Sequence, residues 1–296
     1  MNKEIEPNHI QVSLTENQPV RTQFQIFTVF GDYILGKREG IWTSSLLTLM
    51  DQVGVSERAV RATLSRMRRK GWIASRRDGR RSKYQLTDRG RALLELGQMR
   101  IFEDVFRDWD HQWHLVIYSL SEEKRKLRET LRTQLAWLGF GQLAPGTWIS
   151  PHNRRTELDG IITELGAQPY VDMFSGVYLG PSEEQDLIER SWDLQSLEKL
   201  YKGFIAKYGP KHTELQGKTQ TGGNGIAVED CFVEKFWLTH DFQSFPLTDP
   251  NLPVDLLPGD WAGAAARRLF DEYHQLLGKY VDGYVDDILS EPVRNK

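Results

Sequence analysis

Residues 56–86 read SERAVRATLSRMRRKGWIASRRDGRRSKYQL, and this stretch decides the fold of the N-terminal part. Ser56 is a favourable helix N-cap, and the helix that it opens is predicted to run to about Lys70. The apolar side of this helix consists of Val60, Thr63, Leu64 and Met67. The opposite side carries arginine, serine and alanine, so the segment predicts an amphipathic helix with a basic outer face.

That outer face has the chemistry of a DNA-reading helix. Arginine guanidinium groups match guanine edges and phosphates, and small residues between them let a helix backbone approach the major groove closely. A solvated helix face is the alternative explanation of such a charge run. The candidate DNA contacts on this helix are Ser56, Arg58, Arg61, Ala62, Ser65 and Arg69.

Two strand-like runs follow, residues 72–77 and 80–86, separated by the hairpin signal Asp78-Gly79. Basic residues crowd this hairpin, where they repel one another unless a phosphate backbone relieves the repulsion. A basic helix followed by a basic hairpin predicts a winged helix-turn-helix that binds double-stranded DNA. The candidate contacts in the wing are Arg76, Arg77, Arg80, Arg81, Lys83 and Tyr84.

Further helices are predicted around this motif. Apolar residues recur at helical spacing over residues 24–35, Thr43 or Ser44 caps a second helix, and Thr87 caps a connector helix. Residues 1–20 are expected to be a polar arm, and residues 21–104 the winged helix-turn-helix domain with its connector.

Charge is divided unevenly along the chain. Residues 20–100 carry 17 Lys and Arg against 7 Asp and Glu, whereas residues 101–296 carry 20 against 31. A basic block attached to an acidic remainder indicates a polyanionic partner for the first part only. No apolar run reaches the length of a membrane span, and the lone Cys231 suits a reducing compartment, so we expect a cytoplasmic protein.

Several separate motifs carry a family resemblance. They are FTVFGDYI at residues 27–34, SERAVRATLSR at 56–66, KGW at 70–72, GRRSKY at 79–84, LAPGTWISP at 143–151 and FPLTDPNLP at 245–253. In this order they resemble the PaaX family of phenylacetate-catabolism repressors over nearly the whole chain. The resemblance implies a homodimeric repressor that releases its operator when an aryl-coenzyme A thioester, typically phenylacetyl-CoA, binds. It implies no cofactor.

Residues 105–180 alternate between strand-like and helical patterns. Strands are predicted at 113–119 and 146–150, helices at 122–138 and 156–165, and a strand pair at 170–179. This order favours a small ferredoxin-like sandwich, and the family's middle part resembles the ferredoxin-like, nuclease-related subunit of CRISPR systems. The basic residues of helix 122–138 indicate either a solvated face or an anion site.

Residues 181–296 are predicted to form a helical C-terminal domain. An apolar stripe runs from Leu187 to Phe204, a polar loop is expected over 212–225, and helices follow at 232–242 and 261–289. The proline-rich segment 246–258 is apolar enough to pack as an ordered strap. The fold class is therefore α+β: a winged helix-turn-helix, a ferredoxin-like α/β sandwich and a mostly α-helical C-terminal domain.

The effector is expected between the middle and C-terminal domains. Such a ligand needs an aromatic pocket for its acyl ring and basic groups for its nucleotide phosphates. The candidate effector-binding residues are Trp148, Ile149, His152, Arg154, Arg155 and Trp192.

Catalytic and metal sites are not expected. His212 stands where a phosphate-binding loop ending in Gly217-Lys218-Thr219 needs its first glycine. His111 and His114 lack further ligands nearby, and the pair His240-Asp241 lacks a nucleophile motif. The alternatives to a repressor are a DNA-associated nuclease or nuclease accessory, and a scaffold that binds RNA.

Overall fold

The structure is a computed structural model that describes residues 18–102, 109–223, 225–245 and 249–290. Contacts divide these residues into two compact units. The winged-helix unit comprises the described residues of 18–102, 201–245 and 262–290, and the central unit comprises 109–200 and 249–261. The helices after residue 200 thus group with the N-terminal motif, whereas the sequence suggested a separate domain over 181–296.

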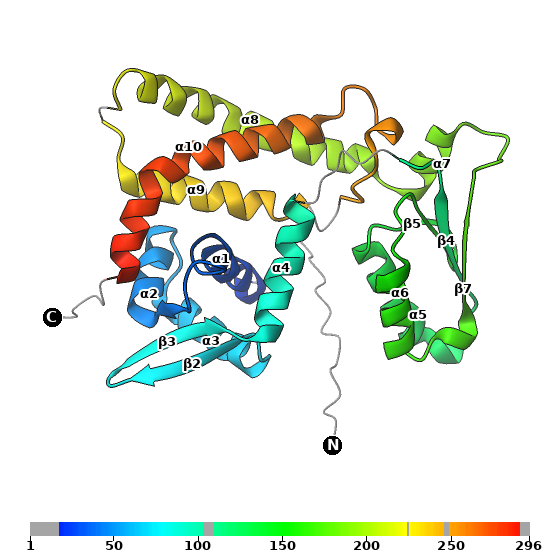
Figure 1. Ribbon diagram of the computed structural model, residues 1–296, viewed down its shortest axis with the longest axis horizontal. Coiled ribbons are helices and arrows are strands. Elements are labelled where there is room, and N and C mark those ends of the chain that lie inside the picture. The colour runs from blue at the N-terminus through cyan, green and yellow to red at the C-terminus, as the bar shows by residue number, and fades with distance from the viewer. Residues whose placement is uncertain (1–17, 103–108, 224, 246–248, 291–296) are drawn as a thin grey trace. The chain divides into compact units, whose positions relative to one another are not determined.

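The N-terminal motif folds as a winged helix. Its helices are α1 (Gln18–Tyr33), α2 (Thr43–Gln52), α3 (Glu57–Arg69) and α4 (Asp88–Phe102), and its strands are β1 (Ile41–Trp42), β2 (Ile73–Asp78) and β3 (Arg81–Leu86). The strands form an antiparallel sheet in the order β1-β3-β2. Figure 1 shows the β2–β3 hairpin extending beyond the helices of this unit.

One predicted helix cap is confirmed and another is wrong. The Thr87 hydroxyl accepts a hydrogen bond from the Gly90 amide at 3.1 Å, so Thr87 caps helix α4 as expected. The N-cap of α2 is Trp42, with no side-chain hydrogen bond. Thr43 does not cap, because its hydroxyl donates to the Ser82 carbonyl on strand β3 at 2.9 Å.

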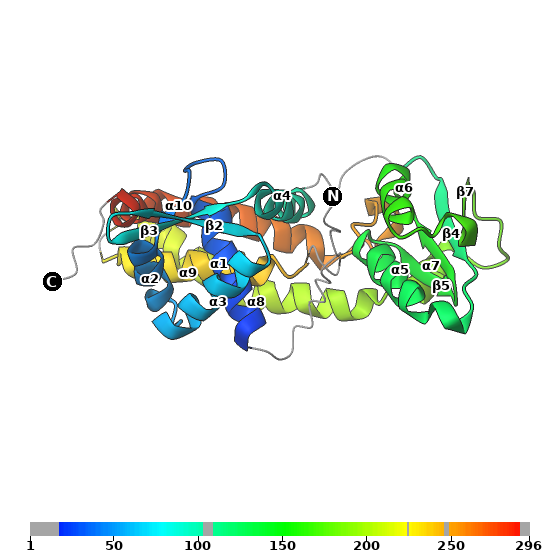
Figure 2. The same ribbon diagram turned by 90° about the horizontal axis from the view of Figure 1, so that it is seen from below.

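Three C-terminal helices complete the winged-helix unit: α8 (Leu194–Gln220), which starts in the central unit, α9 (Val228–Phe242) and α10 (Ala262–Ser290). Helices α9 and α10 pack side by side (Figures 1 and 2). The loop predicted over 212–225 is wrong for residues 212–220, which continue α8. Polarity and the glycine-rich run at residues 222–225 suggested the loop, but Leu215 is buried on this helix.

The central unit is a ferredoxin-like sandwich. Its elements are β4 (Trp113–Tyr118), a 3-10 turn η1 (Glu122–Lys124), α5 (Arg125–Trp137), β5 (Gly141–Ala144), β6 (Thr147–Ser150), α6 (Arg155–Glu164), a second 3-10 turn η2 (Gln168–Tyr170), β7 (Val171–Gly176) and α7 (Glu184–Ser191). The sheet order β5-β6-β4-β7 with antiparallel neighbours confirms the predicted fold. The predicted strand pair at 170–179 is wrong, because only β7 forms there and β5 supplies the fourth strand.

Each face of this sheet has its own apolar core. Helices α5 and α6 cover one face, where Leu135 and Ile162 pack on Val116. The other face packs on α7 and on residues 249–261, which include the 3-10 turn η4 (Val254–Leu256). Leu252 and Leu256 are buried there, so the described part of the proline-rich segment is an ordered strap, as predicted. No helix among the described residues has the length and apolarity to span a membrane.

Candidate nucleic-acid interface

Helix α3 carries a basic face opposite its buried side. The Ala59 amide donates to the Ser56 hydroxyl at 3.4 Å, so Ser56 caps the helix as predicted. The predicted apolar side is also confirmed, because Val60, Thr63, Leu64 and Met67 are all buried. All of the helix residues that are predicted to contact DNA are exposed to solvent: Ser56, Arg58, Arg61, Ala62, Ser65 and Arg69.

One of these arginines has an acidic neighbour on its own helix. Arg61 Nε lies 2.6 Å from Glu57 Oε1, and both side chains are more than half exposed. Exposed pairs one helical turn apart contribute about 0.3–0.5 kcal/mol. A phosphate or a guanine edge can therefore compete with Glu57 for Arg61 at little cost.

The wing is a regular hairpin with a basic tip. Its register opposes Arg76 to Lys83 and Asp78 to Arg81. Gly79 in the turn has a φ of 59°, a backbone conformation that glycine adopts without a side-chain clash. The wing arginines are exposed to solvent: Arg76, Arg77, Arg80 and Arg81.

The two remaining wing candidates lie deeper in the sheet. Lys83 is half-buried, and its Nζ lies 3.7 Å from the Glu39 carboxylate. Tyr84 is half-buried in the middle strand, between Ser75 of β2 and Ile41 of β1. Both residues are thus less accessible to a ligand than the arginines at the tip.

A contact between a cation and an aromatic ring joins the helix to the wing. The Lys70 ammonium, just after α3, lies 4.3 Å from the centre of the Trp72 ring, just before β2. Burial, with a smaller contribution from the Arg66 charge, lowers the pKa of Lys70. Trp72 itself is buried against Phe27 of helix α1. The base of the wing is therefore fixed relative to α3.

These arginines form a surface of uncompensated positive charge. Among the described residues no carboxylate forms an ion pair with Arg58, Arg69 or the four exposed wing arginines. Helix α3 packs on strand β2, so both groups belong to one rigid part of the unit. This arrangement suits a surface that receives a polyanion.

The six candidate effector residues are not brought together. Trp148 and Ile149 are neighbours on β6, so their side chains point to opposite faces and lie in different cores. Arg154 Nη1 lies 3.5 Å from the Glu157 carboxylate, and Arg155 Nε lies 3.7 Å from that of Asp159. These two arginines are neutralised locally on helix α6.

The other two candidates hold the central unit together. A ring nitrogen of His152 hydrogen-bonds to the Asn251 carbonyl at 2.6 Å and thereby ties the strap to β6. The Trp192 indole donates to the Gly139 carbonyl at 3.2 Å. Of the six candidates, only Trp192 also lines a surface hollow between the end of α7 and the start of α8.

Comparisons with known proteins agree with the motifs. Three family models match: "PaaX-like protein" over residues 21–90, "PaaX protein central Cas2-like domain" over 107–188 and "PaaX-like protein C-terminal domain" over 192–287. The transcriptional repressor PaaX of Escherichia coli is 30% identical over 272 residues, which are 91% of this chain and 84% of the relative. The chain belongs to the PaaX-like family of transcriptional repressors.

A solved relative shares the fold. The uncharacterized protein Rv0674 of Mycobacterium tuberculosis is 24% identical, with a TM-score of 0.56 over 90% of this chain and 99% of its own. The family model that matches residues 107–188 is described as Cas2-like, which agrees with the ferredoxin-like sheet of the central unit.

The histidines within the described residues of this PaaX-like chain belong to no cluster of metal ligands. No three His, Cys, Asp or Glu side chains gather there as metal ligands. His240 and Asp241 turn to different partners: His240 Nδ1 lies 3.3 Å from the Thr28 hydroxyl, whereas the Asp241 carboxylate accepts hydrogen bonds from Lys207 and Tyr208. Burial lowers the pKa of His240 to about 4, so its ring is neutral at pH 7.

Sequence reasoning missed a buried polar cluster between α1 and the C-terminal helices. The Thr239 hydroxyl donates to the Asp32 carboxylate at 3.0 Å, and His274 Nε2 lies 3.6 Å from the same carboxylate. Lys235 is buried, with its Nζ 3.5 Å from the Tyr33 hydroxyl. A signal was present, because Asp32 is a charged residue shortly after the largely apolar run 26–30 of helix α1.

Proposed function

We propose that this PaaX-like chain represses transcription by binding operator DNA through helix α3 and the β2–β3 wing. The observation that carries the proposal is the group of exposed arginines on α3 and the wing tip that have no acidic partner among the described residues. No catalytic step is part of the proposal. The chain acts by occupying DNA.

The two elements have different tasks in this proposal. Helix α3 enters the major groove, where Arg61 and its neighbours read base edges and small Ala62 and Ser65 permit close approach. The wing tip tracks adjacent phosphates, which supply affinity without sequence preference. Contacts of both kinds are needed for a specific repressor.

We infer that the protein acts as a homodimer. One helix-turn-helix reads only a few base pairs, which is too little information for a single operator, and two half-sites related by a two-fold axis supply the rest. Two DNA-binding regions with a large positive charge repel each other. The acidic part of the chain beyond residue 102 therefore carries the dimer contacts in this proposal.

We also infer that an aryl-CoA thioester, such as phenylacetyl-CoA, releases the operator. The support is the family membership, since this effector class was expected from the resemblance. A ligand that lowers DNA affinity a hundredfold must favour the released state by about 2.7 kcal/mol.

Fluorescence anisotropy with the promoter DNA of the gene's own operon tests these proposals. We expect tight binding that weakens steeply with salt, intact DNA in the presence of Mg²⁺, and release by phenylacetyl-CoA but not by phenylacetate or coenzyme A alone. Equal affinity for promoter and unrelated DNA would remove the repressor proposal. Specific binding that no thioester weakens would contradict only the proposed effector. A single subunit bound to a full operator would contradict the proposed homodimer.

A further inference from the structure

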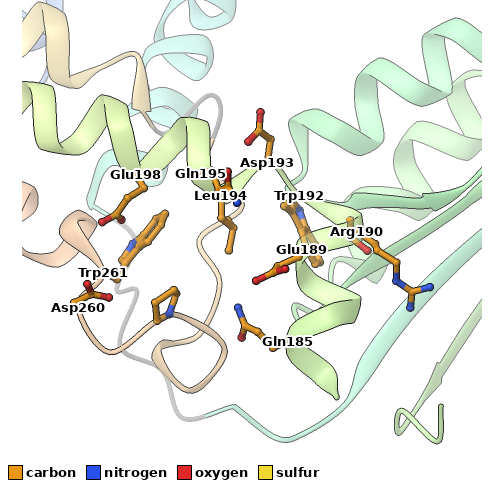
Figure 3. A pocket seen from close by; sticks show the side chains of 12 residues that line it. Gln185, Glu189, Arg190, Trp192, Asp193, Leu194, Gln195, Glu198, Asp260 and Trp261 are labelled. Atoms are coloured by element: carbon orange, nitrogen blue, oxygen red, sulfur yellow. The ribbon is translucent and has the colours of Figure 1, made fainter. Parts of the chain in front are cut away.

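A hollow of about 490 Å³ lies in the central unit, where helix α7 ends and helix α8 begins (Figure 3). Its walls come from α7, the first turns of α8 and residues 258–261 of the strap. The volume is in the range of small-molecule sites. The lining residues that determine its chemistry are Trp192, Trp261, Glu189, Asp193, Glu198 and Asp260.

Two indole rings form the apolar part of the lining. Trp192 and Trp261 are half-buried against the same apolar core, and Figure 3 shows them on opposite sides of the hollow. Trp192 is firmly held: its Nε1 donates to the Gly139 carbonyl, and its ring stacks at 6.4 Å on Trp113. The position is sterically fixed as well, since a Cβ on Gly141 would lie 2.5 Å from Trp192 Cε2.

The polar part of the lining is acidic. Among the described residues, Glu189 and Asp260 have neither an ion pair nor a hydrogen-bond partner. The lining contains one basic residue, Arg190, and its side chain extends away from the hollow in Figure 3. The walls therefore leave a net negative charge beside two aromatic faces.

The helix ends do not reverse this sign. The N-terminus of α8 would favour an anion, but the Asp193 carboxylate already accepts from the Ser196 amide at 3.0 Å and occupies that end. Hydrogen bonds from Ser196 lower the pKa of Asp193, so the carboxylate remains ionised. The C-terminal end of α7 carries the negative end of its helix dipole and therefore favours a cation.

We propose that this hollow binds a small organic cation, with an ammonium or guanidinium head beside the carboxylates of Glu189 and Asp260. The apolar body of the ligand lies against the indoles of Trp192 and Trp261. Indole faces attract cations through their negative electrostatic potential, and carboxylates add a second attraction of the same sign. A polyanion such as a coenzyme A thioester is repelled by the same groups. This cation site therefore differs in chemistry from a site for an aryl-CoA thioester, and it does not depend on the DNA-binding proposal.

Three probes of similar shape and different charge test the site in the full-length protein: phenethylammonium, phenethyl alcohol and hydrocinnamate. NMR signals of the Trp192 and Trp261 indole N–H groups, assigned with the single Trp→Phe variants, report binding. We expect the cation to shift both signals and to bind about tenfold more tightly than the alcohol. The proposal is overturned if the cation leaves both signals unmoved at millimolar concentration, or if the alcohol or the carboxylate binds as well.

A charge-removing variant separates the site from general surface attraction. In Glu189→Gln/Asp260→Asn, affinity for phenethylammonium is expected to fall about tenfold, with each substitution contributing about two- to fivefold. Glu272→Gln, an exposed glutamate on α10, is the matched control and leaves the affinity unchanged. Unchanged affinity in the double variant, or an equal loss in the control, overturns the proposal.

Discussion

The Thr239 hydroxyl on helix α9 donates a hydrogen bond to the Asp32 carboxylate on helix α1 at 3.0 Å, although the two residues are 207 positions apart. Helix α1 also packs on α3, which carries the basic face. Helix α1 therefore lies between the proposed DNA-reading helix and the C-terminal helices. Changes in α9 or α10 have a direct physical route to α3.

The charge of Asp32 is expected to stabilise this junction. Asp32→Asn keeps an oxygen that accepts from Thr239 but removes the negative charge near buried Lys235 and His274. Breaking a buried charge cluster in this way should lower the free energy of unfolding by about 3 kcal/mol, measured by urea denaturation. The control is Asp286→Asn, because the Arg38–Asp286 pair is exposed and should contribute at most about 1 kcal/mol.

Acidification should remove the stabilisation that the charge of Asp32 gives to the folded state. Burial raises the pKa of this carboxyl, but His274, Lys235 and Thr239 together outweigh burial and hold the pKa below 3.8. The folded state therefore binds this proton less readily than the unfolded state, and the stabilisation is present above pH 3.8 and lost as the pH falls further. The stability difference between the parent and Asp32→Asn should shrink on acidification; a growing difference would contradict this account.

His240 should make stability fall in a second, higher pH window. Burial lowers its folded-state pKa from 6.5 to about 4, so between these values the unfolded state alone gains the proton. Stability is then fully present above pH 6.5 and falls by at most about 1.4 kcal/mol per pH unit on the way to pH 4. In His240→Gln, unfolding curves across this window should show a smaller slope. The same slope in both proteins would show that another group titrates there.

Two arginine variants separate base reading from phosphate contact. Arg61→Ala on α3 should weaken specific sites by about 1–3 kcal/mol, whereas Arg81→Ala at the wing tip should weaken all sequences alike and reduce the salt slope by about one unit. Anisotropy titrations at several salt concentrations distinguish the two effects. Arg132→Ala, at an exposed position of α5, is the control and should leave DNA affinity unchanged. Unchanged DNA affinity in both test variants would contradict the proposed contact of the winged helix with DNA.

Gly90 is expected to be essential for the packing of helix α4 against the wing. A Cβ at this position would lie 1.9 Å from the Trp72 carbonyl oxygen, so the backbone must move. Gly90→Ala should cost about 1–3 kcal/mol of stability by thermal or urea unfolding. Gly203→Ala, at an exposed and open position of α8, should instead stabilise by about 0.5–1 kcal/mol, because alanine is the better helix residue. A stabilising Gly90→Ala would contradict the close approach.

Local chemistry made the α3–wing region predictable. Ser56, Thr87 and the Asp78-Gly79 turn act through contacts a few residues away, and apolar periodicity places Val60 and Leu64 inside. The ferredoxin-like order followed from the same local patterns. None of these features depends on a partner far along the chain.

The features that sequence reasoning missed depend on distant partners. Helix α8 continues past residue 212 because Leu215 is buried and the Thr219 hydroxyl contacts Tyr280 of α10. Strand β5 is short and starts at Gly141, whose role is visible only beside Trp192. The acidic lining of the hollow is likewise assembled from α7, α8 and the strap, which local periodicity does not relate.

The grouping of residues 18–102 with 201–245 and 262–290 also sets a time order for biosynthesis. Asp32 leaves the ribosome 207 residues ahead of its partner Thr239, and His274 follows later still. At common synthesis rates the first helix waits roughly 10–50 s for the last. During that interval the Asp32 carboxylate lacks these partners, so a nascent or truncated chain without α10 leaves this side of α1 exposed to solvent.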